Sequence, residues 1–224
     1  MLSEAELNLD KYEDSLNTLE RFEKNYWMNW LPGSKAWVLM KMGRIKEAIK
    51  VSKKGLIEGA EPRRTWNILG ILLSMQGQRE QSLKAFRQAI ISEMMSSRQA
   101  ATPLNNSGEV YRELFRDAEA ELAWIKALEM SDGCEHVLPS LNLAHSYIEQ
   151  LRLFQAERTL NDFEACFKKS ADREDSEHRT LLALAKGKIA LRKNNIELAD
   201  QLFQTAMADQ QLSLIHISEP TRPY

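Results

Sequence analysis

Four asparagines are the residues of this sequence best suited to recognising another polypeptide: Asn67, Asn105, Asn106 and Asn142. A side-chain amide donates and accepts hydrogen bonds at once, so it can pair with the peptide groups of a partner whatever the partner's sequence. We expect Asn67, either Asn105 or Asn106, and Asn142 to form a short ladder of such amides. The alternative is that they are tolerated polar residues of a solvated surface.

Residue patterns that would support catalysis are missing. The sequence has no phosphate-binding GxxxxGK[ST] loop, no HExxH metal site and no GxSxG nucleophile elbow. Cys134 and His136 are two residues apart, but a structural zinc site normally takes four ligands. His145 is a lone histidine, more typical of a surface or packing position than of a catalytic one. We therefore predict no enzymatic activity, no metal and no cofactor.

Charge and cysteine content point to a cytoplasmic protein. The net charge of −2 gives no bulk electrostatic reason to bind nucleic acid or an anionic membrane. The acidic N-terminus does not resemble a signal peptide, and no apolar run reaches the roughly 18 residues of a membrane span. Cys134 and Cys166 are too few and too far apart for a disulfide framework, so reduced thiols are expected.

The stretch from Trp66 to Ile90 predicts two antiparallel helices. Apolar residues recur at spacings of three and four on either side of a break at Gln76-Gly77-Gln78. Gly77 supplies the turn because it can adopt a positive φ. Gly70 and Ser82 are small and lie 12 residues apart, so the two helix backbones can approach closely.

The same pair of small residues recurs along the chain with an unchanged separation of 12. The five pairs are Ala36 and Ala48, Gly70 and Ser82, Gly108 and Ala120, Ala144 and Ala156, and Gly187 and Ala199. The distance from one pair to the next varies from 34 to 43 residues. Invariant hairpins with variable joints are what a stacked solenoid predicts. A leading helix precedes them, in which Ser15, Leu19 and Phe22 copy the second-helix pattern.

These repeats resemble the tetratricopeptide repeat (TPR) family. The best unit is WNILGILLSMQGQREQSLKAF after Pro62, which matches the Trp, Leu-Gly, Ala and Phe positions of that family, and LNNSGEVY is the next best. The resemblance covers roughly residues 3–210. It implies an all-α, right-handed superhelix of about five hairpins plus the leading helix. The expected core is Leu69, Leu73, Phe86, Tyr111, Trp124, Leu143, Tyr147, Leu160, Ile189 and Phe203.

The resemblance also implies where a partner binds. The first helices of such hairpins line the concave wall of the stack, and partners, usually extended peptides or helices, lie along it. The candidate binding residues are those of the first helices that do not point at the second: Asn67, Ile71, Asn105, Asn106, Glu109, Arg112, Asn142, His145 and Lys188. We expect a protein or peptide partner, with no nucleic acid and no membrane bound by this segment.

The first full repeat departs from the family pattern. Pro32-Gly33 falls where its first helix should start, so that helix should be short. Gly55 stands where alanine is usual, and Trp27, Trp30 and Trp37 crowd the region. The tryptophans either fill a capping core or form an exposed aromatic patch awaiting a partner or a preceding repeat.

The chain ends in LSLIHISEPTRPY, which does not fit the repeats. Leu214 to Ser218 alternate with period two, a strand pattern, and two prolines follow. The string resembles a translated sequencing adapter. We therefore divide the chain into a TPR array at residues 1–211, expected to be a fragment of a longer protein, and a non-native tail at residues 212–224.

The function predicted from these observations is a non-enzymatic protein-interaction scaffold that binds along its concave surface. The alternative is a sensory or regulatory TPR arm of a larger signalling protein, such as a transcription regulator. A basic helix-turn-helix domain downstream would favour this alternative.

Overall fold

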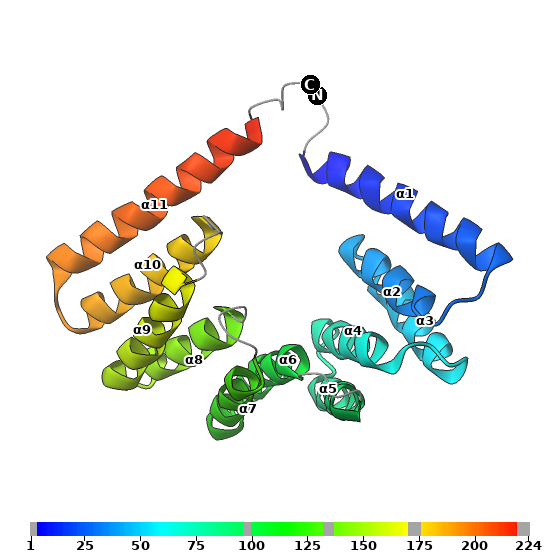
Figure 1. Ribbon diagram of the computed structural model, residues 1–224, viewed down its shortest axis with the longest axis horizontal. Coiled ribbons are helices and arrows are strands. Elements are labelled where there is room, and N and C mark those ends of the chain that lie inside the picture. The colour runs from blue at the N-terminus through cyan, green and yellow to red at the C-terminus, as the bar shows by residue number, and fades with distance from the viewer. Residues whose placement is uncertain (1–3, 96–99, 132–136, 170–175, 219–224) are drawn as a thin grey trace. The chain divides into compact units, whose positions relative to one another are not determined.

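A computed structural model describes residues 4–95, 100–131, 137–169 and 176–218 of the chain, and these residues form helices and no strand (Figure 1). The helices are α1 (Glu4–Asn25), α2 (Leu31–Lys41), α3 (Ile45–Ile57), α4 (Pro62–Met75), α5 (Arg79–Met95), α6 (Ala101–Glu113), α7 (Asp117–Glu129), α8 (Val137–Glu149), α9 (Leu153–Lys169), α10 (Ser176–Arg192) and α11 (Ile196–Ser218). The leading helix α1 is followed by five hairpins, from α2–α3 to α10–α11. This confirms the predicted all-α, TPR-type architecture.

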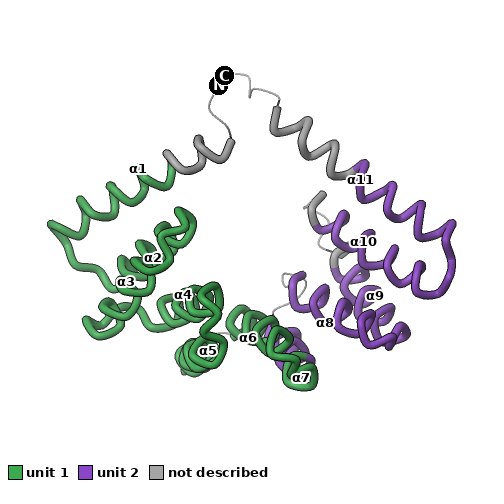
Figure 2. Tube along the Cα trace, turned by 180° about the vertical axis from the view of Figure 1, so that it is seen from behind, with its two compact units in different colours: residues 1–120 green, residues 121–224 purple. Residues whose placement is uncertain are grey.

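The helices form two compact units, residues 1–120 and 121–224, with the boundary inside α7 (Figure 2). In unit 1 each helix from α1 to α5 packs on the next one, and the first helix α4 also contacts the first helices α2 and α6. In unit 2, α8 contacts both α9 and α10, and α10 packs along α11. Contacts therefore lie mainly within a hairpin and otherwise between adjacent hairpins, as in a repeat protein.

The predicted close approach of the two helices of a hairpin is present in α4–α5. The Ser82 hydroxyl donates a hydrogen bond of 2.7 Å to the Gly70 carbonyl oxygen across the pair. A Cβ atom on Gly70 would lie 2.5 Å from Cε1 of the buried Phe86 ring. In α10–α11, a Cβ on Gly187 would likewise lie 2.5 Å from Cε1 of Phe203. Both glycines are therefore required by the aromatic ring that packs against them.

This packing explains why the first small residue is glycine in some hairpins and alanine in others. The residue 16 positions later is aromatic where the small residue is glycine and smaller where it is alanine. The five pairs are Ala36 and Ser52, Gly70 and Phe86, Gly108 and Trp124, Ala144 and Leu160, and Gly187 and Phe203. At Gly70 and Gly187, where the structure describes this packing, the phenylalanine ring occupies the space that a larger first residue would take.

Each hairpin turns through one residue in the left-handed region, seven positions after the small residue. These residues are Gly43, Gly77, Phe115, Leu151 and Asn194. In the α4–α5 turn the backbone N–H of Gln78 donates to the Leu73 carbonyl at 2.9 Å, which is the hydrogen bond of a Schellman cap. Phe115 and Leu151 adopt φ values of 57° and 58°, a conformation that is unfavourable for bulky side chains.

The packing of α2 on α3 explains why the sequence of the first hairpin departs from the repeat pattern. Helix α2 has 11 residues and begins at Leu31 with Pro32 in its first turn, so the expected short helix is confirmed. The side chain of Pro32 occupies the place that a Cβ on Gly55 would take. The proline that shortens α2 therefore explains the glycine that replaces alanine in α3.

Most of the expected core is buried. Eight of the ten residues are buried, and Tyr111 and Phe203 are half-buried. In the leading helix, Ser15 is exposed and Leu16 is buried in its place, whereas Leu19 packs against the same cluster as predicted. Serine lacks the apolar surface that this contact buries.

The strand pattern read at Leu214 to Ser218 was wrong, because α11 continues to Ser218. After Ile196 the sequence has no glycine or proline before Pro220, so nothing stops the helix at that point. Residues 219–224 lie outside the described part of the chain. The division at residue 211 and the adapter origin of the tail stay predictions.

Candidate functional site

One rung of the expected amide ladder is present in unit 1. The Asn106 side chain on α6 donates a hydrogen bond of 3.1 Å to the side-chain oxygen of Asn67 on α4. Both residues are half-buried on neighbouring first helices. This hydrogen bond leaves each amide further donor or acceptor capacity. The pair fixes the orientation of two amides that a partner could reach.

Asn105 has a different environment from Asn106. It is only 4% exposed, and its amide donates to the Glu109 carboxylate at 3.2 Å, one turn along α6. The sequence left open whether Asn105 or Asn106 belonged to the ladder. The structure pairs Asn106 with Asn67, and it gives Asn105 little surface with which to contact a partner.

Two more candidates lie on the same two helices. Ile71 follows Asn67 by four residues, which places it on the same side of α4, and it is half-buried. Arg112 on α6 is half-buried as well. Ile71 thus places an apolar side chain beside the amide pair, whereas Arg112 lies six residues after Asn106 along α6.

The remaining candidates lie in unit 2. Asn142 and His145 are half-buried on α8, and Lys188 is exposed on the neighbouring helix α10. Nε2 of His145 lies 3.0 Å from the Glu149 carboxylate, one turn further along α8. His145 is therefore held by its own helix, as expected for a surface histidine.

An unpredicted network in unit 2 joins α7, α8 and the α8–α9 turn. The Tyr147 hydroxyl donates to Glu121 at 3.0 Å, and the Arg152 guanidinium binds the same carboxylate at 2.5 and 3.2 Å. The guanidinium also lies over the Tyr147 ring, 4.4 Å from its centre. Burial raises the pKa of Tyr147 above its usual value, and its hydrogen bond to Glu121 raises it further. Because these residues come from three different elements, no local sequence pattern predicted the network.

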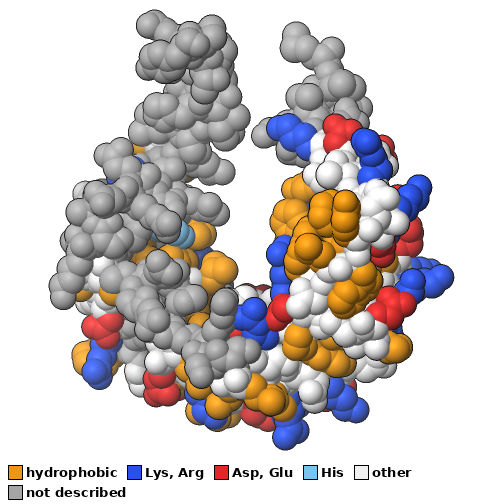
Figure 3. Space-filling view, turned by 45° about the vertical axis from the view of Figure 1, so that its right-hand side comes forward, with side chains coloured by type: hydrophobic (Ala, Val, Ile, Leu, Met, Phe, Trp, Pro, Cys, Tyr) orange, Lys and Arg blue, Asp and Glu red, His pale blue; other side chains and the backbone are white. Residues whose placement is uncertain are grey.

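The three crowded tryptophans have different roles. Trp37 is half-buried and packs edge-on against Tyr12 of α1, with ring centres 6.0 Å apart, so it belongs to the core. Trp27 and Trp30 are 54% and 40% exposed. Figure 3 shows hydrophobic side chains gathered on the N-terminal helices of unit 1, which stand at the right of Figure 1. The capping-core interpretation thus holds for Trp37, and the exposed-patch interpretation for the other two.

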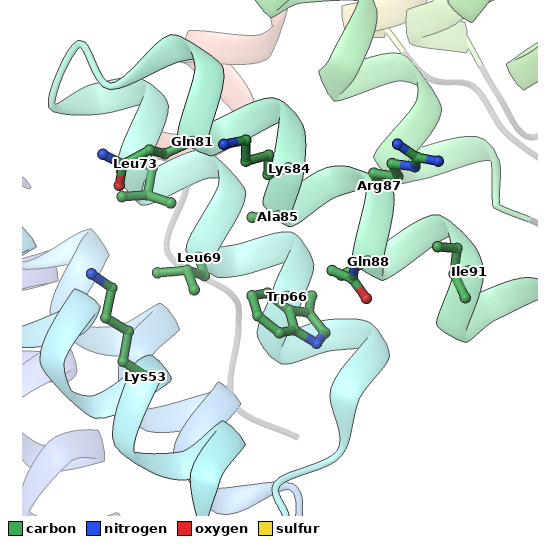
Figure 4. Close-up of a pocket in the computed structure, with 10 residues that line it drawn as sticks. All are labelled: Lys53, Trp66, Leu69, Leu73, Gln81, Lys84, Ala85, Arg87, Gln88 and Ile91. Atoms are coloured by element: carbon green, nitrogen blue, oxygen red, sulfur yellow. The ribbon is translucent and has the colours of Figure 1, made fainter.

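A groove in unit 1, which the sequence reading missed, lies between the second helices α3 and α5. Its volume is about 490 Å³, and Trp66, Leu69 and Leu73 of α4 form its floor with Ala85 of α5. Figure 4 shows Lys53 on one side of this floor, with Lys84 and Gln88 on the other side. The remaining lining residues are Gln81, Arg87 and Ile91 of α5. The helical periodicity of the sequence identifies Lys53 and Lys84 only as exposed residues of separate helices. It does not show the groove, because the groove forms where α3 and α5 lie side by side.

The equivalent place in unit 2 holds a groove of about 520 Å³ between α9 and α11. Here the lysines of the lining are paired within the protein. Nζ of Lys186 lies 2.6 Å from the Glu164 carboxylate, and Nζ of Lys193 lies 2.6 Å from that of Glu157. The two grooves therefore lie at the same position in the repeat, but the lysines that line the unit 2 groove are paired with glutamates.

Other kinds of site find little support in the described part of the chain. There, no three His, Cys, Asp or Glu residues come together in a way that could hold a metal ion. Cys134 and His136 lie outside the described residues. Within the same limits, no helix is both long and apolar enough to cross a membrane. Cys166 on α9 is disulfide-bonded, whereas reduced thiols were expected.

Solved structures with the same fold are found, although the sequence matches no protein-family model and no curated protein. BtubC (BKLC) from P. vanneervenii is similar with a TM-score of 0.71 and 13% identity, over 100% of this chain and 96% of that one. A thermophilic TPR protein of Thermus thermophilus has a TM-score of 0.62 and 21% identity, over 80% and 92%. YrrB, a TPR protein with an unusual peptide-binding site, has a TM-score of 0.55 and 14% identity, over 86% and 91%. At such low identity the likeness establishes the fold alone.

Proposed function

We propose that this chain, which has the TPR fold, is a non-enzymatic interaction scaffold that binds a peptide or a helix of another protein. The partner would lie along the first helices, on the concave surface expected of such a stack. In unit 1 this is the surface of α2, α4 and α6, which we call the first-helix face. One of the similar structures, YrrB, has a peptide-binding site by its description, which is consistent with this class of function.

The observation that carries the proposal is the hydrogen bond between Asn67 and Asn106. Its 3.1 Å length joins two neighbouring first helices, and both amides keep hydrogen-bonding capacity for peptide groups. Two amides fixed in this way lose little side-chain freedom when a partner binds. Ile71, four residues from Asn67, adds an apolar contact beside them.

The test is affinity capture with the full chain immobilised, using lysate of the source organism and quantitative mass spectrometry. We compare the wild type with the double variant Asn67→Ala/Asn106→Ala. The matched control is Gln76→Ala/Gln78→Ala, because Gln78 donates to Gln76 at 3.1 Å in another amide pair, at the α4–α5 turn. Loss of two hydrogen bonds of about 1 kcal/mol each should reduce capture of the true partner about tenfold or more.

The control should capture the same partner at the wild-type level. Both variants should unfold within about 1 kcal/mol of the wild type in urea, because the substituted amides are not deeply buried. A partner captured equally by the wild type and by the Asn67/Asn106 variant would refute binding at this face.

A cytoplasmic location is the second part of the proposal, and the redox state of Cys166 in the cell tests it. Disulfides persist mainly in oxidising compartments. Thiol labelling in intact cells, followed by mass spectrometry of the peptide that contains Cys166, distinguishes the two cases. A labelled Cys166 supports the cytoplasm, and a Cys166 that reacts only after reduction argues for an oxidising compartment.

A further inference from the structure

The α3–α5 groove of unit 1 combines an apolar floor with a basic rim. Leu69, Leu73 and Ala85 are buried, and Trp66 is half-buried beside them. A volume of about 490 Å³ lies in the range of pockets that hold ligand groups, roughly 300–1,000 Å³. Because Leu69, Leu73 and Ala85 are almost fully covered, the apolar surface open to a ligand comes mainly from Trp66 and from Ile91, which is 41% exposed. This surface can accept an apolar side chain.

The rim carries three cations and two amides. Lys53 stands on α3, and Lys84 and Arg87 stand on α5, and all three are exposed. Gln81 and Gln88 lie on α5 with Lys84 between them, at helical spacing. Of the described residues, no aspartate or glutamate lines the groove, and none forms a salt bridge with these three cations.

We propose that this groove is a second binding site, which takes an acidic amphipathic peptide segment of a partner protein. Bulky apolar side chains of the peptide fill the floor, and its carboxylates meet Lys53, Lys84 and Arg87. The amides of Gln81 and Gln88 accept and donate hydrogen bonds to its polar groups. The peptide docks as an amphipathic helix does in a groove, through anchors at positions i, i+3, i+4 and i+7.

The charge pattern favours a peptide over a nucleic acid or a membrane. A nucleic-acid site neutralises many phosphates, and a lipid-binding segment carries roughly four to eight cations. This groove offers three cations around a buried apolar floor, on a chain of net charge −2. Such an arrangement matches an apolar surface bordered by a few carboxylates.

The equivalent groove of unit 2 shows two features that would prevent an acidic peptide from binding. Lys186 and Lys193 are each neutralised by a glutamate at 2.6 Å, so they offer no free charge to a ligand. Leu202 stands where the unit 1 groove has Ala85, and it fills part of the floor. The unit 1 groove has neither feature.

Fluorescence anisotropy with labelled synthetic peptides tests the proposal. The probes are acidic helical peptides of about twelve residues with leucine or phenylalanine at i, i+3, i+4 and i+7. Two comparison sets replace either the glutamates by lysine or the apolar anchors by serine. We expect the wild-type chain to bind the acidic amphipathic set at least about tenfold more tightly than either comparison set, and more weakly as salt rises.

Two variants locate the binding. Lys53→Glu/Lys84→Glu/Arg87→Glu should weaken it about tenfold or more, and Ala85→Leu, which copies Leu202, should weaken it by filling the floor. The matched control Lys11→Glu/Lys46→Glu/Lys50→Glu changes the net charge equally at exposed positions outside the groove, and it should bind as the wild type does. Circular dichroism confirms that each variant is folded.

Several results would overturn the proposal. These are no binding of any acidic amphipathic probe up to about 1 mM, equal binding by the basic set, or unchanged binding by the groove variants. Tighter lysine-dependent binding of a single-stranded oligonucleotide or of anionic vesicles would assign the groove to another class of ligand. Asn67→Ala/Asn106→Ala should leave probe binding unchanged, so failure at this groove is distinct from failure at the first-helix face.

Discussion

The hairpins α4–α5 and α10–α11 share a glycine–phenylalanine contact between their two helices, but they contact the preceding hairpin in different ways. In both, a glycine faces a phenylalanine 16 residues later, and a Cβ on either glycine would come within 2.5 Å of the ring. They differ in how they contact the hairpin before them. Leu69 precedes Gly70, whereas Lys186 precedes Gly187 at the same position.

The partners of these two residues differ in the same way. Leu56 of α3 packs against the cluster that contains Leu69, and the residue equivalent to Leu56 in α9 is Glu164, which binds Lys186 at 2.6 Å. The contact within a hairpin is therefore fixed by volume, whereas the contact between hairpins can be apolar or ionic. Different surfaces can thus be built on one backbone.

The largest expected difference concerns the two phenylalanines. Phe86→Ala should lower the free energy of unfolding by about 3–5 kcal/mol, because Phe86 is 1% exposed and its loss leaves a cavity. Phe203→Ala should cost about half as much, because Phe203 is half-buried. Urea denaturation with hydrogen exchange of the α4–α5 and α10–α11 peptides measures both. Equal costs would show that the two interiors are equivalent despite their different burial.

The next effect tests the pairing of volumes. Gly70→Ala should destabilise the chain by about 1–3 kcal/mol, because the added methyl group overlaps the Phe86 ring. Adding Phe86→Leu, which copies the alanine–leucine pair at Ala144 and Leu160, should recover part of that loss. A double-mutant cycle in urea measures the coupling. If the two costs simply add, volume does not couple these positions.

A smaller effect is expected at the ionic boundary. Glu164→Leu alone should cost about 1–2 kcal/mol, because it leaves the partly buried Lys186 without its carboxylate. Glu164→Leu/Lys186→Leu, which copies the apolar boundary of α4, should be neutral or slightly stabilising. Thermal unfolding in low and high salt measures this, and the double variant should lose salt sensitivity. A double variant less stable than Glu164→Leu would show that the ion pair is required.

The smallest effect concerns the turns of the two hairpins. Gly77→Ala should cost about 1 kcal/mol, because Gly77 adopts φ 75°. Asn194→Gly should change stability by only a few tenths of a kcal/mol, because asparagine tolerates φ 59°. Thermal melts of both variants check this. A large gain at Asn194 would mean that its turn is as strained as those at Phe115 and Leu151, which have bulkier side chains.

The sequence predicted the features that depend on contacts within one hairpin. The positions of Gly70, Ser82 and Phe86 and the turn at Gly77 were all anticipated, because a fixed spacing along the chain implies a fixed relation between two helices. The leading helix and the contact of Leu19 were anticipated too, but the burial of Leu16 in place of Ser15 was not. A pattern match to Ser15 carries less information than the apolar area of Leu16.

Features that depend on contacts between hairpins were largely missed. Lys53 and Lys84 line one groove from helices in different hairpins, and each is merely an exposed lysine on its own helix. The choice between Asn105 and Asn106 likewise needed the position of α6 against α4. Because the number of residues between hairpins varies, the spacing along the chain does not determine how one hairpin lies against the next. A sequence pattern therefore predicts the structure of a hairpin better than the surface that several hairpins form.

The glycine–phenylalanine pair also bears on how such a chain can be recombined. Both residues lie within one hairpin, 16 positions apart, so duplicating a whole hairpin copies both and keeps their volumes matched. A crossover at the turn would separate them and could join an alanine to a phenylalanine, with the overlap described for Gly70. Workable chimeras of this chain should therefore have their junctions between hairpins, where the spacing already varies.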